Sequence, residues 1–415
     1  MRQIVAIVSV VAAVVVSASS WAQVVQLGPR PFFLVDQLPA GPLKTQLERC
    51  VVERTRYAHH DFSIGHRGAP LQFPEHTRES YLAAHRMGAG IIECDVTFTK
   101  DKALVCRHAQ CDLHRSTNIL VTPLADRCEV AFSPATFAAD GRLKQKAQAK
   151  CCASALTLAE FKTLRGKMDG FNERALTPVD ALDATAAYRT DLYVNPGTLM
   201  SHRESIRLID SLGAKFTPEL KGIDKAVGFG ESGLNQSRYA SAIVADYRAE
   251  QIDPSRVFLQ SFSPADIAHW LKAFPEFGRQ AVWLDGRRVS SLAASPPDAD
   301  AFAALYKQGL RYLAPPIPVL LKRDGNELVA SDYARRATAA GLKLITWTTE
   351  RSGRIENEVL KGRGQYYYQT LLPAMQNDGD ILTVIDALAK EAGVVGIFSD
   401  WAATTTFYAN CALDN

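Results

Sequence analysis

Eight short apolar segments recur along this sequence, and most of them are separated by stretches with helical spacing. They span residues 62–65, 91–98, 215–221, 257–262, 281–284, 312–314, 342–348 and 394–399. Apolar strands that alternate with helices form parallel sheets that are covered by those helices. The sequence therefore predicts an α/β protein with a (β/α)₈ TIM barrel, and an open doubly wound sheet is the alternative.

Polar side chains stand at or near the carboxyl ends of many of these segments. They are His66, Asp95, Glu219, Gln260, Trp347 and Asp400. The active sites of barrel enzymes are built at this end of the strands. The pattern favours the barrel over the open sheet and indicates where a site would lie.

Two acidic residues, Glu93 and Asp95, interrupt the apolar segment at 91–98. Side chains at positions i and i+2 of a strand point to the same side, so both carboxylates face one way. Paired carboxylates in an apolar strand are unfavourable unless a cation or a basic partner neutralises them. Such oxygen ligands suit Ca²⁺ or Mg²⁺. The polar edge of an ordinary strand, with an Arg or Lys partner, explains the spacing equally well.

The region around these acids carries six ordered motifs, namely His66-Arg67-Gly68, Pro74-Glu75-His76-Thr77, Gly88-Ala89, Glu93-x-Asp95, Thr99-Lys100-Asp101 and His108. Their order resembles the N-terminal signature of the glycerophosphodiester phosphodiesterase family, and the histidine after Pro-Glu is similar to its periplasmic branch. Two positions depart from the family pattern, because Ala109 replaces an aspartate and Lys102 replaces a glycine. The first departure leaves the orientation of His108 less tightly defined.

The resemblance implies a metal site that a third acid completes. In the family this acid belongs to a Glu-x-Lys motif, which Glu219 and Lys221 match. Glu93, Asp95 and Glu219 would then hold one divalent cation, Ca²⁺ or Mg²⁺. A salt bridge between Glu219 and Lys221 at a strand end is the structural alternative.

The implied chemistry is the hydrolysis of a phosphodiester. His66 and His108 are expected to act as general acid and general base, in an order that the sequence leaves open. Arg67 is expected to neutralise the nonbridging oxygens with its planar fork, and Lys221 with a point charge. The nucleophile is either water or the neighbouring hydroxyl of the glycerol, through a cyclic phosphate.

Three further residues are assigned to substrate binding. Glu75 either orients Arg67 or contacts the water of the metal, although an acid favoured at a helix N-terminus is an equal alternative. Trp347 and Phe262 are candidate walls for the alcohol, although most aromatic residues in barrel strands belong to the core. Asp400 is interpreted as structural.

Together these expectations describe a metal-dependent enzyme that cleaves small-molecule glycerophosphodiesters to sn-glycerol 3-phosphate and an alcohol. A related barrel of the phospholipase D or sphingomyelinase D type is one alternative, and it would need an exposed apolar rim for membrane contact. An exported, non-catalytic binding protein on the same fold is the other. The formal net charge of +3 is near balance, so it indicates neither a nucleic-acid partner nor a stable membrane anchor.

The N-terminus predicts export to the periplasm or the medium. Residues 1–22 combine an arginine, a short apolar run and small residues before Gln23, which is typical of a secretory signal peptide. Residues 23–61 are interpreted as an N-terminal wrap over the barrel floor. Residues 62–415 are interpreted as the barrel, with a loop-rich insertion at 109–156 after the second strand that covers the site.

Eight cysteines in an exported chain favour disulfides. Cys50 precedes the first strand and Cys411 follows the last, so this pair is expected to clip the two ends together. Cys94 is expected to be a buried free thiol that packs against the helices. The remaining cysteines around the insertion, whose pairing the sequence leaves open, include Cys111, Cys128, Cys151 and Cys152.

Overall fold

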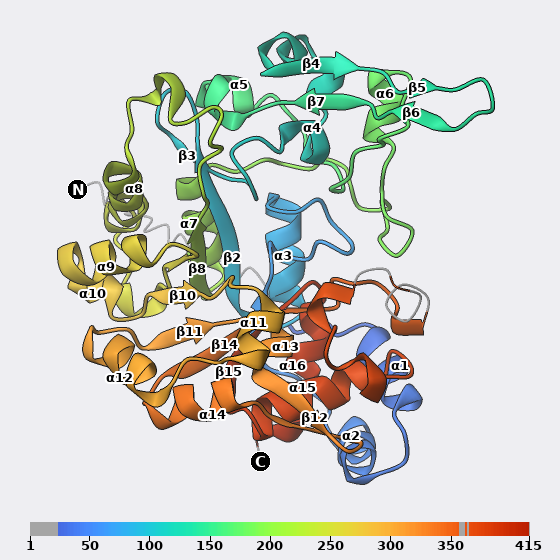
Figure 1. Ribbon diagram of the computed structural model, residues 1–415, viewed down its shortest axis with the longest axis vertical. Coiled ribbons are helices and arrows are strands. Elements are labelled where there is room, and N and C mark those ends of the chain that lie inside the picture. The colour runs from blue at the N-terminus through green and yellow to red at the C-terminus, as the bar shows by residue number, and fades with distance from the viewer. Residues whose placement is uncertain (1–23, 357–361, 363–364, 415) are drawn as a thin grey trace, which may run out of the picture.

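Figure 1 shows the computed structural model of the chain, which describes residues 24–356, 362 and 365–414. A barrel surrounded by helices occupies the lower part of this view, and a smaller layer of short elements lies above it. The predicted signal peptide, at residues 1–22, lies outside the described residues.

Parallel strands form the barrel. In chain order they are β1 (His60–Gly65), β2 (Ala89–Phe98), β8 (Lys215–Leu220), β9 (Gln260–Ser261), β10 (Val282–Leu284), β11 (Tyr312–Ala314), β14 (Lys343–Thr349) and β15 (Val394–Ser399). Each strand pairs with the next, and β1 pairs with both β2 and β15, which closes the sheet. The predicted (β/α)₈ barrel is confirmed, and the open doubly wound sheet is excluded.

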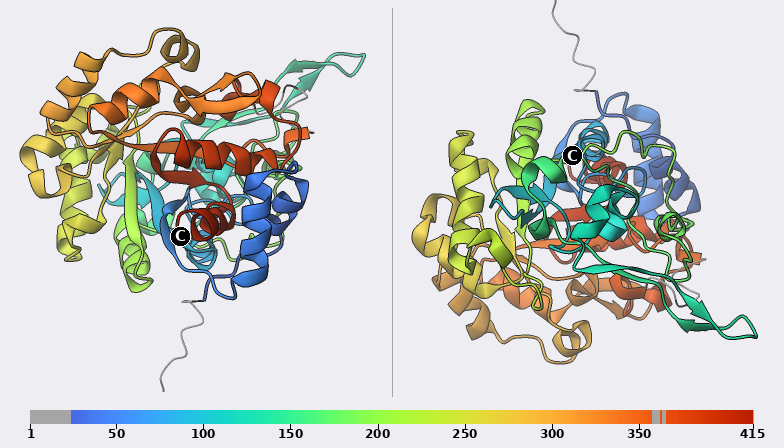
Figure 2. Two further views of the ribbon diagram at one scale, coloured as in Figure 1. Left: turned by 90° about the horizontal axis from the view of Figure 1, so that it is seen from below. Right: turned by 90° about the horizontal axis from the view of Figure 1, so that it is seen from above.

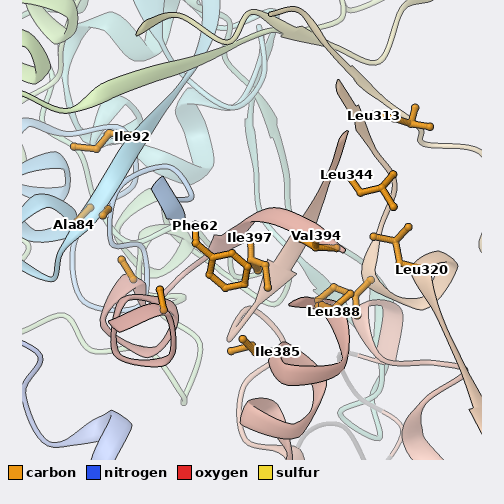
Figure 3. Close-up of a cluster of buried hydrophobic side chains, with 14 of the residues drawn as sticks. Phe62, Ala84, Ile92, Leu313, Leu320, Leu344, Ile385, Leu388, Val394 and Ile397 are labelled. Carbon is orange, nitrogen blue, oxygen red and sulfur yellow. The ribbon is translucent and has the colours of Figure 1, made fainter. Parts of the chain in front are cut away.

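Apolar side chains fill both sides of the barrel wall, which explains why the strand segments are almost continuously apolar. On the outside, Phe62 of β1 and Ile397 of β15 pack with Ile385 and Leu388 of α15 (Asp380–Lys390), as Figure 3 shows. A separate cluster fills the inside of the barrel and comprises Ile64, Ile91, Phe258, Val282, Leu284, Ala314, Ile345 and Phe398.

Helices cover the outer surface of the barrel (Figure 2). They are α1 (Arg30–Gln37), α2 (Pro42–Glu53), α3 (Arg78–Arg86), α7 (His202–Ser211), α8 (Gln236–Ala249), α9 (Pro264–Ala273), α10 (Pro275–Gly278), α11 (Val289–Ala294), α12 (Ala299–Lys307), α13 (Ile317–Leu320), α14 (Asp332–Ala339), α15 and α16 (Ala402–Ala412). A hairpin of β12 (Leu321–Asp324) and β13 (Glu327–Ala330) lies between α13 and α14. Within the described ranges, no helix has the length and apolar character needed to cross a membrane.

The two ends of the chain meet at the amino end of the barrel, where α2 packs against α16. Cys50 in α2 forms a disulfide with Cys411 in α16, and their Cα atoms are 5.6 Å apart. Asn410 accepts a hydrogen bond from the Ala58 amide at 2.8 Å and donates one to the Ala58 carbonyl at 3.0 Å. The predicted clip between Cys50 and Cys411 is therefore confirmed.

The segment between β3 (Leu104–Cys106) and α7 forms the layer above the carboxyl end of the barrel (Figures 1 and 2). Its own hydrophobic cluster runs from Val105 to Leu199, so this layer extends well beyond residue 156. Its elements are α4 (Leu113–Ser116), β4 (Val130–Ser133), β5 (Thr136–Phe137), β6 (Leu143–Gln145), β7 (Gln148–Lys150), α5 (Leu158–Phe161) and α6 (Pro178–Leu182). Two disulfides staple it, Cys111–Cys152 and Cys128–Cys151.

The prediction that Cys94 is a free thiol is wrong, because Cys94 forms a disulfide with Cys106. After β2 the chain turns back, and β3 pairs antiparallel with the end of β2, with Val96 opposite Cys106. Cys94 lies on the same side of β2 as Val96, diagonal to Cys106, and the Cα atoms of the two cysteines are 5.3 Å apart. The segment pattern predicted the strand but not the register of the returning hairpin, which brings the second sulfur within reach.

Candidate active site

Three carboxylates from two neighbouring strands meet at the carboxyl end of the barrel. Glu93 and Asp95 lie on β2 and Glu219 lies on β8, and the parallel register places Asp95 opposite Glu219. One oxygen of each residue lies within 4.8 Å of the others, and all three residues are buried. Glu93 and Asp95 are two residues apart on β2 and face the same side of it. Their carboxylates therefore form a compact group of possible oxygen ligands with that of Glu219.

The electrostatics of this group fit a divalent cation. Burial, together with repulsion from Asp95 and Glu219, raises the pKa of Glu93 well above its ordinary value. Burial raises the pKa of Glu219 to about 7, against the attraction of Lys221. Burial also acts to raise the pKa of Asp95, but Lys221 and His76 hold this pKa well below its ordinary range. The Oδ1 atom of Asp95 is buried without a hydrogen-bond partner among the described residues, so it is available to a hard cation such as Ca²⁺ or Mg²⁺.

His66 follows β1 directly and lies beside the carboxylates. Its Nδ1 atom is 2.5 Å from Oδ1 of Asp400, and its Nε2 atom is 3.8 Å from Oε2 of Glu93. Burial lowers the pKa of the imidazole to about 4, although the negative charge of Asp400 opposes this shift. Asp400, which follows β15, also pairs with Arg351 at 2.9 Å. Asp400 therefore orients the ring so that its other nitrogen faces the carboxylates.

His108 lies in the same cavity, which has a volume of about 290 Å³. Burial, followed by the positive charges of Arg67 and Lys221, lowers the pKa of its imidazole well below the ordinary value. In the described part of the chain, no hydrogen bond fixes the His108 ring, in contrast to the ring of His66. The walls of the cavity carry His66, His108, Arg67, Glu93, Glu219 and Lys221.

Arg67 adopts a left-handed backbone conformation with φ of 54°. This turn lets its amide donate a hydrogen bond to Oε2 of Glu93 at 2.9 Å. The Nη1 atom of the guanidinium donates to Oε2 of Glu75 at 3.1 Å, and Nε is 3.5 Å from Oδ2 of Asp95. Burial would raise the pKa of Glu75, but Arg67 and Arg351 hold it well below the ordinary value. Of the contacts expected for Glu75, the one with Arg67 is present.

Lys221 and an aromatic wall complete the cavity. The Nζ atom of Lys221 is 2.7 Å from Oε1 of Glu219, so the salt bridge considered as an alternative is also present. The rings of Phe262 and Trp347 are nearly perpendicular, with centroids 5.8 Å apart. Tyr367 adds a third ring, 6.3 Å from Trp347. Phe262 is 44% exposed, so its ring is accessible to a ligand.

For several residues of the site, no role was predicted from the sequence. His76 places Nε2 2.9 Å from Oδ2 of Asp95, and Gln260 donates from Nε2 to Oε1 of Glu93 at 2.7 Å. His76 belongs to a recognised motif and Gln260 ends a predicted strand, so both positions were visible in the sequence. Arg351 lies in the loop after β14, where no periodic pattern marks it.

The family of the chain follows from its match to a family model. Residues 66–404, which include every acid and imidazole described above, match the model of the glycerophosphoryl diester phosphodiesterase family. The chain belongs to this family. The match begins at His66, where β1 enters the site.

Individual proteins similar to this chain cover different shares of it. A protein of Arthroderma benhamiae named "Extracellular protein" is 46% identical over 246 residues, which are 59% of this chain and 99% of that protein. The glycerophosphodiester phosphodiesterase of Bacillus subtilis is 45% identical over 56 residues, 14% of this chain and 19% of that protein. A solved structure from Silicibacter pomeroyi, named for the same family, has a TM-score of 0.51 and 19% identity and covers 84% of this chain and 92% of its own. This structural likeness supports the barrel fold alone.

Proposed function

We propose that this chain hydrolyses small glycerophosphodiesters to sn-glycerol 3-phosphate and an alcohol, with one divalent cation and a pair of histidines. The observation that carries the proposal is the shared cavity, because Glu93, Glu219, His66 and His108 all line it. Hydrolysis of a phosphodiester requires that the charge of the phosphate is neutralised and that two protons are moved. These residues supply groups for both tasks, and membership of the family supports the same reaction.

The carboxylates are proposed to hold the cation, Ca²⁺ or Mg²⁺, through Glu93, Asp95 and Glu219. When bound, the cation supplies a Lewis acid for an oxygen of the phosphate. Arg67 offers a planar fork to the nonbridging oxygens, and Lys221 offers a compact positive charge. The hydrogen bond from Arg67 to Glu75 preorganises the guanidinium, which reduces the free energy needed to orient it when the substrate binds.

His66 and His108 are proposed to move the protons. One imidazole takes a proton from the nucleophile, and the other gives a proton to the oxygen of the departing alcohol. The contact with Asp400 favours the tautomer of His66 that carries hydrogen on Nδ1, so Nε2 is the reactive nitrogen on the side of the cavity. Asp400 is thus proposed as a positioning residue rather than a purely structural one.

The alcohol is proposed to lie against Phe262 and Trp347. Trp347 donates from Nε1 to the Ala314 carbonyl at 2.8 Å, so its ring is held in one orientation. The accessible ring of Phe262 meets it almost at a right angle. An apolar corner of this kind contacts the carbon atoms of a head group without requiring a particular hydrogen-bonding group.

We also propose that the chain acts outside the cytoplasm. Its disulfides Cys50–Cys411, Cys94–Cys106, Cys111–Cys152 and Cys128–Cys151 are of a kind that persists in oxidising compartments. The relative from Arthroderma benhamiae is named an extracellular protein. In this proposal, residues 1–22 are the signal peptide that directs export. Residues 23–61 then form the N-terminal wrap, and residues 62–415 form the barrel.

The test is a turnover assay with chelation and metal add-back. The purified chain is incubated with glycerophosphocholine, glycerophosphoethanolamine or glycerophosphoglycerol, and release of sn-glycerol 3-phosphate is measured. We expect turnover that EDTA abolishes and that Ca²⁺ or Mg²⁺ restores, because the charges of the carboxylates and the phosphate repel each other without a cation. Turnover that persists after complete chelation would contradict the metal assignment.

Matched variants separate the cation site from general charge effects. Glu219→Gln removes one charge from the site and should abolish or strongly reduce turnover and cation affinity. Glu276→Gln removes a charge from an exposed ion pair with Arg248 and should change neither. Hydrolysis of intact phospholipid in vesicles, without hydrolysis of glycerophosphodiesters, would favour the phospholipase D-type alternative.

A further inference from the structure

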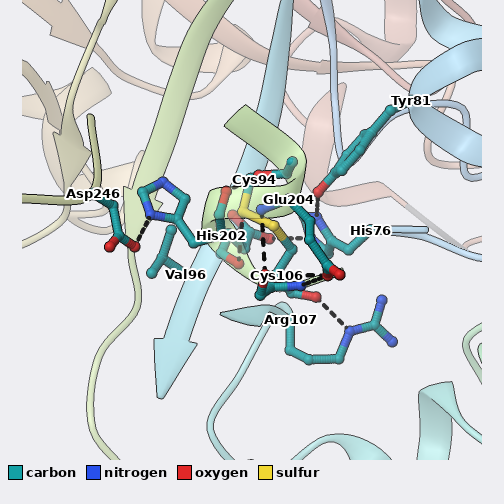
Figure 4. Close-up of a disulfide and its surroundings, with 12 residues drawn as sticks. His76, Tyr81, Cys94, Val96, Cys106, Arg107, His202, Glu204 and Asp246 are labelled. Atoms are coloured by element: carbon teal, nitrogen blue, oxygen red, sulfur yellow. Dashed lines mark hydrogen bonds and ion pairs between the residues drawn. A yellow bond between two sulfur atoms is a disulfide. The ribbon is translucent and has the colours of Figure 1, made fainter. Parts of the chain in front are cut away.

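The disulfide between Cys94 and Cys106, drawn in Figure 4, lies next to the carboxylates of the site along β2. Cys94 stands between Glu93 and Asp95 in β2, and its side chain points to the opposite side of the strand. Cys94 is 2% exposed and Cys106 is 0% exposed, so the bridge is fully enclosed. It joins the strand that carries two of the carboxylates to the strand that leads to His108.

The strand β3 is the edge strand of the sheet, and its three residues are buried. It pairs with β2 over only three residues, Leu104–Cys106, and it stands at the end of the strand order, outside the closed barrel. A pairing this short is marginal by itself. On its other side, Val105 forms an isolated bridge with Ser201. The Cys106 amide also donates to the Met200 carbonyl at 3.1 Å, and the disulfide adds a covalent cross-link between β3 and the barrel.

Arg107 extends this link from the disulfide to the cavity. Its amide donates to the Asp95 carbonyl at 2.8 Å. Its buried guanidinium donates to the carbonyls of Cys106 and Glu75. The backbone just before His108 is thus tied to both neighbouring segments of the site. Among the described residues, no hydrogen bond holds the His108 ring, so its place depends on this backbone and on packing in the cavity.

We infer that the Cys94–Cys106 disulfide is a positioning element for His108, an inference that rests on the proposed function. By fixing β3 on β2, it sets the place of the imidazole relative to Glu93 and Asp95. Displacement of a reacting group by about 1 Å can lower a rate about 100-fold. Glu93 and Asp95 stay on β2, inside the barrel, when the bridge is absent. Its loss should therefore lower kcat without a matching change in KM or in cation affinity.

A disulfide that only stabilises the fold leads to a different expectation. Cross-links act mainly on the unfolded chain, and the effect grows with the length of the closed loop. Cys94 and Cys106 are 12 residues apart in sequence, whereas Cys50 and Cys411 are 361 apart. If stability were the only role, removal of the disulfide that closes the longer loop would lower Tm more, and removal of either disulfide would leave kcat unchanged.

The experiment compares Cys94→Ala/Cys106→Ala with the matched control Cys50→Ala/Cys411→Ala in the full chain. Thermal unfolding gives Tm, glycerophosphocholine turnover gives kcat and KM, and isothermal titration calorimetry gives the affinity for Ca²⁺ or Mg²⁺. All assays run below both unfolding midpoints. We expect kcat of the Cys94/Cys106 variant to fall at least about tenfold, with KM and cation affinity within about threefold of wild type. The Cys50/Cys411 control should have a lower Tm than the wild type, with kcat within about twofold of the wild-type value.

Three results would overturn the inference, namely an unchanged kcat in the Cys94/Cys106 variant, an equal loss of kcat in the control, or a parallel loss of cation affinity. If the double alanine variant does not fold, the variant Cys94→Ala/Cys106→Val is used instead, because it restores much of the lost side-chain volume. The same measurements are made on it. Absence of turnover in the wild-type chain would remove the proposed function together with the inference. Normal wild-type turnover with an unaffected variant would remove the inference alone.

Discussion

The two ends of the barrel share the same strands but are closed in opposite ways. At the carboxyl end, buried charges converge, and repulsion between Glu93 and Glu219 contributes to the raised pKa of Glu93. At the amino end, closure relies on a disulfide between Cys50 and Cys411 and paired hydrogen bonds between Asn410 and Ala58, and the charges there form solvent-exposed pairs such as Lys215–Asp61. Buried charge disfavours folding until it is neutralised, whereas the disulfide and the hydrogen bonds of the amino end only add stability. We therefore expect changes at the carboxyl end to affect turnover and changes at the amino end to affect stability.

Among the barrel strands, β1 joins the residues compared at these two ends. β1 begins two residues after Ala58 and ends immediately before His66. If the division of roles holds, changes at the two ends of this strand should affect different measurements. Four substitutions at three places test it, and they are given in order of expected effect on turnover.

The largest effect is expected from the imidazoles at the carboxyl end. His66→Ala or His108→Ala should each lower kcat by about 10²–10⁴-fold, because each removes one proton transfer from the reaction. Tm should change little for His108→Ala, since its ring has no hydrogen bond to lose in the described structure. Turnover of glycerophosphocholine and thermal unfolding provide the two measurements.

The matched control for the imidazoles is His269→Ala. His269 lies on α9, outside the site, and its Nε2 atom is 2.9 Å from Oγ of Ser241. The His269→Ala substitution should leave kcat unchanged. A variant of His66 or His108 that kept wild-type turnover would show that the carboxyl end does not carry the reaction in the way proposed.

A smaller effect is expected at the aromatic wall. Phe262→Ala should raise KM by about fivefold with little change in kcat, because about 1 kcal/mol of apolar contact with the alcohol is lost. The control is Phe33→Ala in α1, since Phe33 is 45% exposed and Phe262 is 44% exposed. If both variants gave the wild-type KM, the alcohol would have to bind elsewhere in the cavity.

The smallest effect on turnover is expected at the amino end. Asn410→Ala removes both hydrogen bonds to Ala58 and should lower the free energy of unfolding by about 1–3 kcal/mol. Urea unfolding measures this loss, and kcat should stay at the wild-type value. A drop in kcat comparable to that of the histidine variants would break the distinction between the two ends.

Much of the barrel and of the site was predictable because it depends on local patterns. Apolar runs marked the strands, and the spacing of Glu93 and Asp95 placed both carboxylates on one side of a strand. The position of Cys50 before the first strand and of Cys411 after the last indicated their pairing. In each case the relevant geometry follows from the alternation of side chains or from the order of elements.

Other parts of the site depend on contacts that no local pattern records. The register of β3 on β2 decides that Cys94 meets Cys106, and a register is set by the turn and by packing. Arg351 reaches Asp400 from the loop after β14, where neither strand nor helix spacing applies. The upper layer extends beyond its predicted end because the helices that follow residue 156, α5 and α6, have only four and five residues and leave little periodicity to detect.

The link between Cys50 and Cys411 also makes the chain a covalent ring over most of its length. Gly141 lies between β5 and β6, in the hairpin that projects furthest from the upper layer in Figure 1. Cutting the backbone there would release no fragment, because disulfides would still join the two pieces. The cut molecule would have its new termini in the layer above the site and would behave as a circular permutant whose old ends are joined by sulfur instead of a peptide bond.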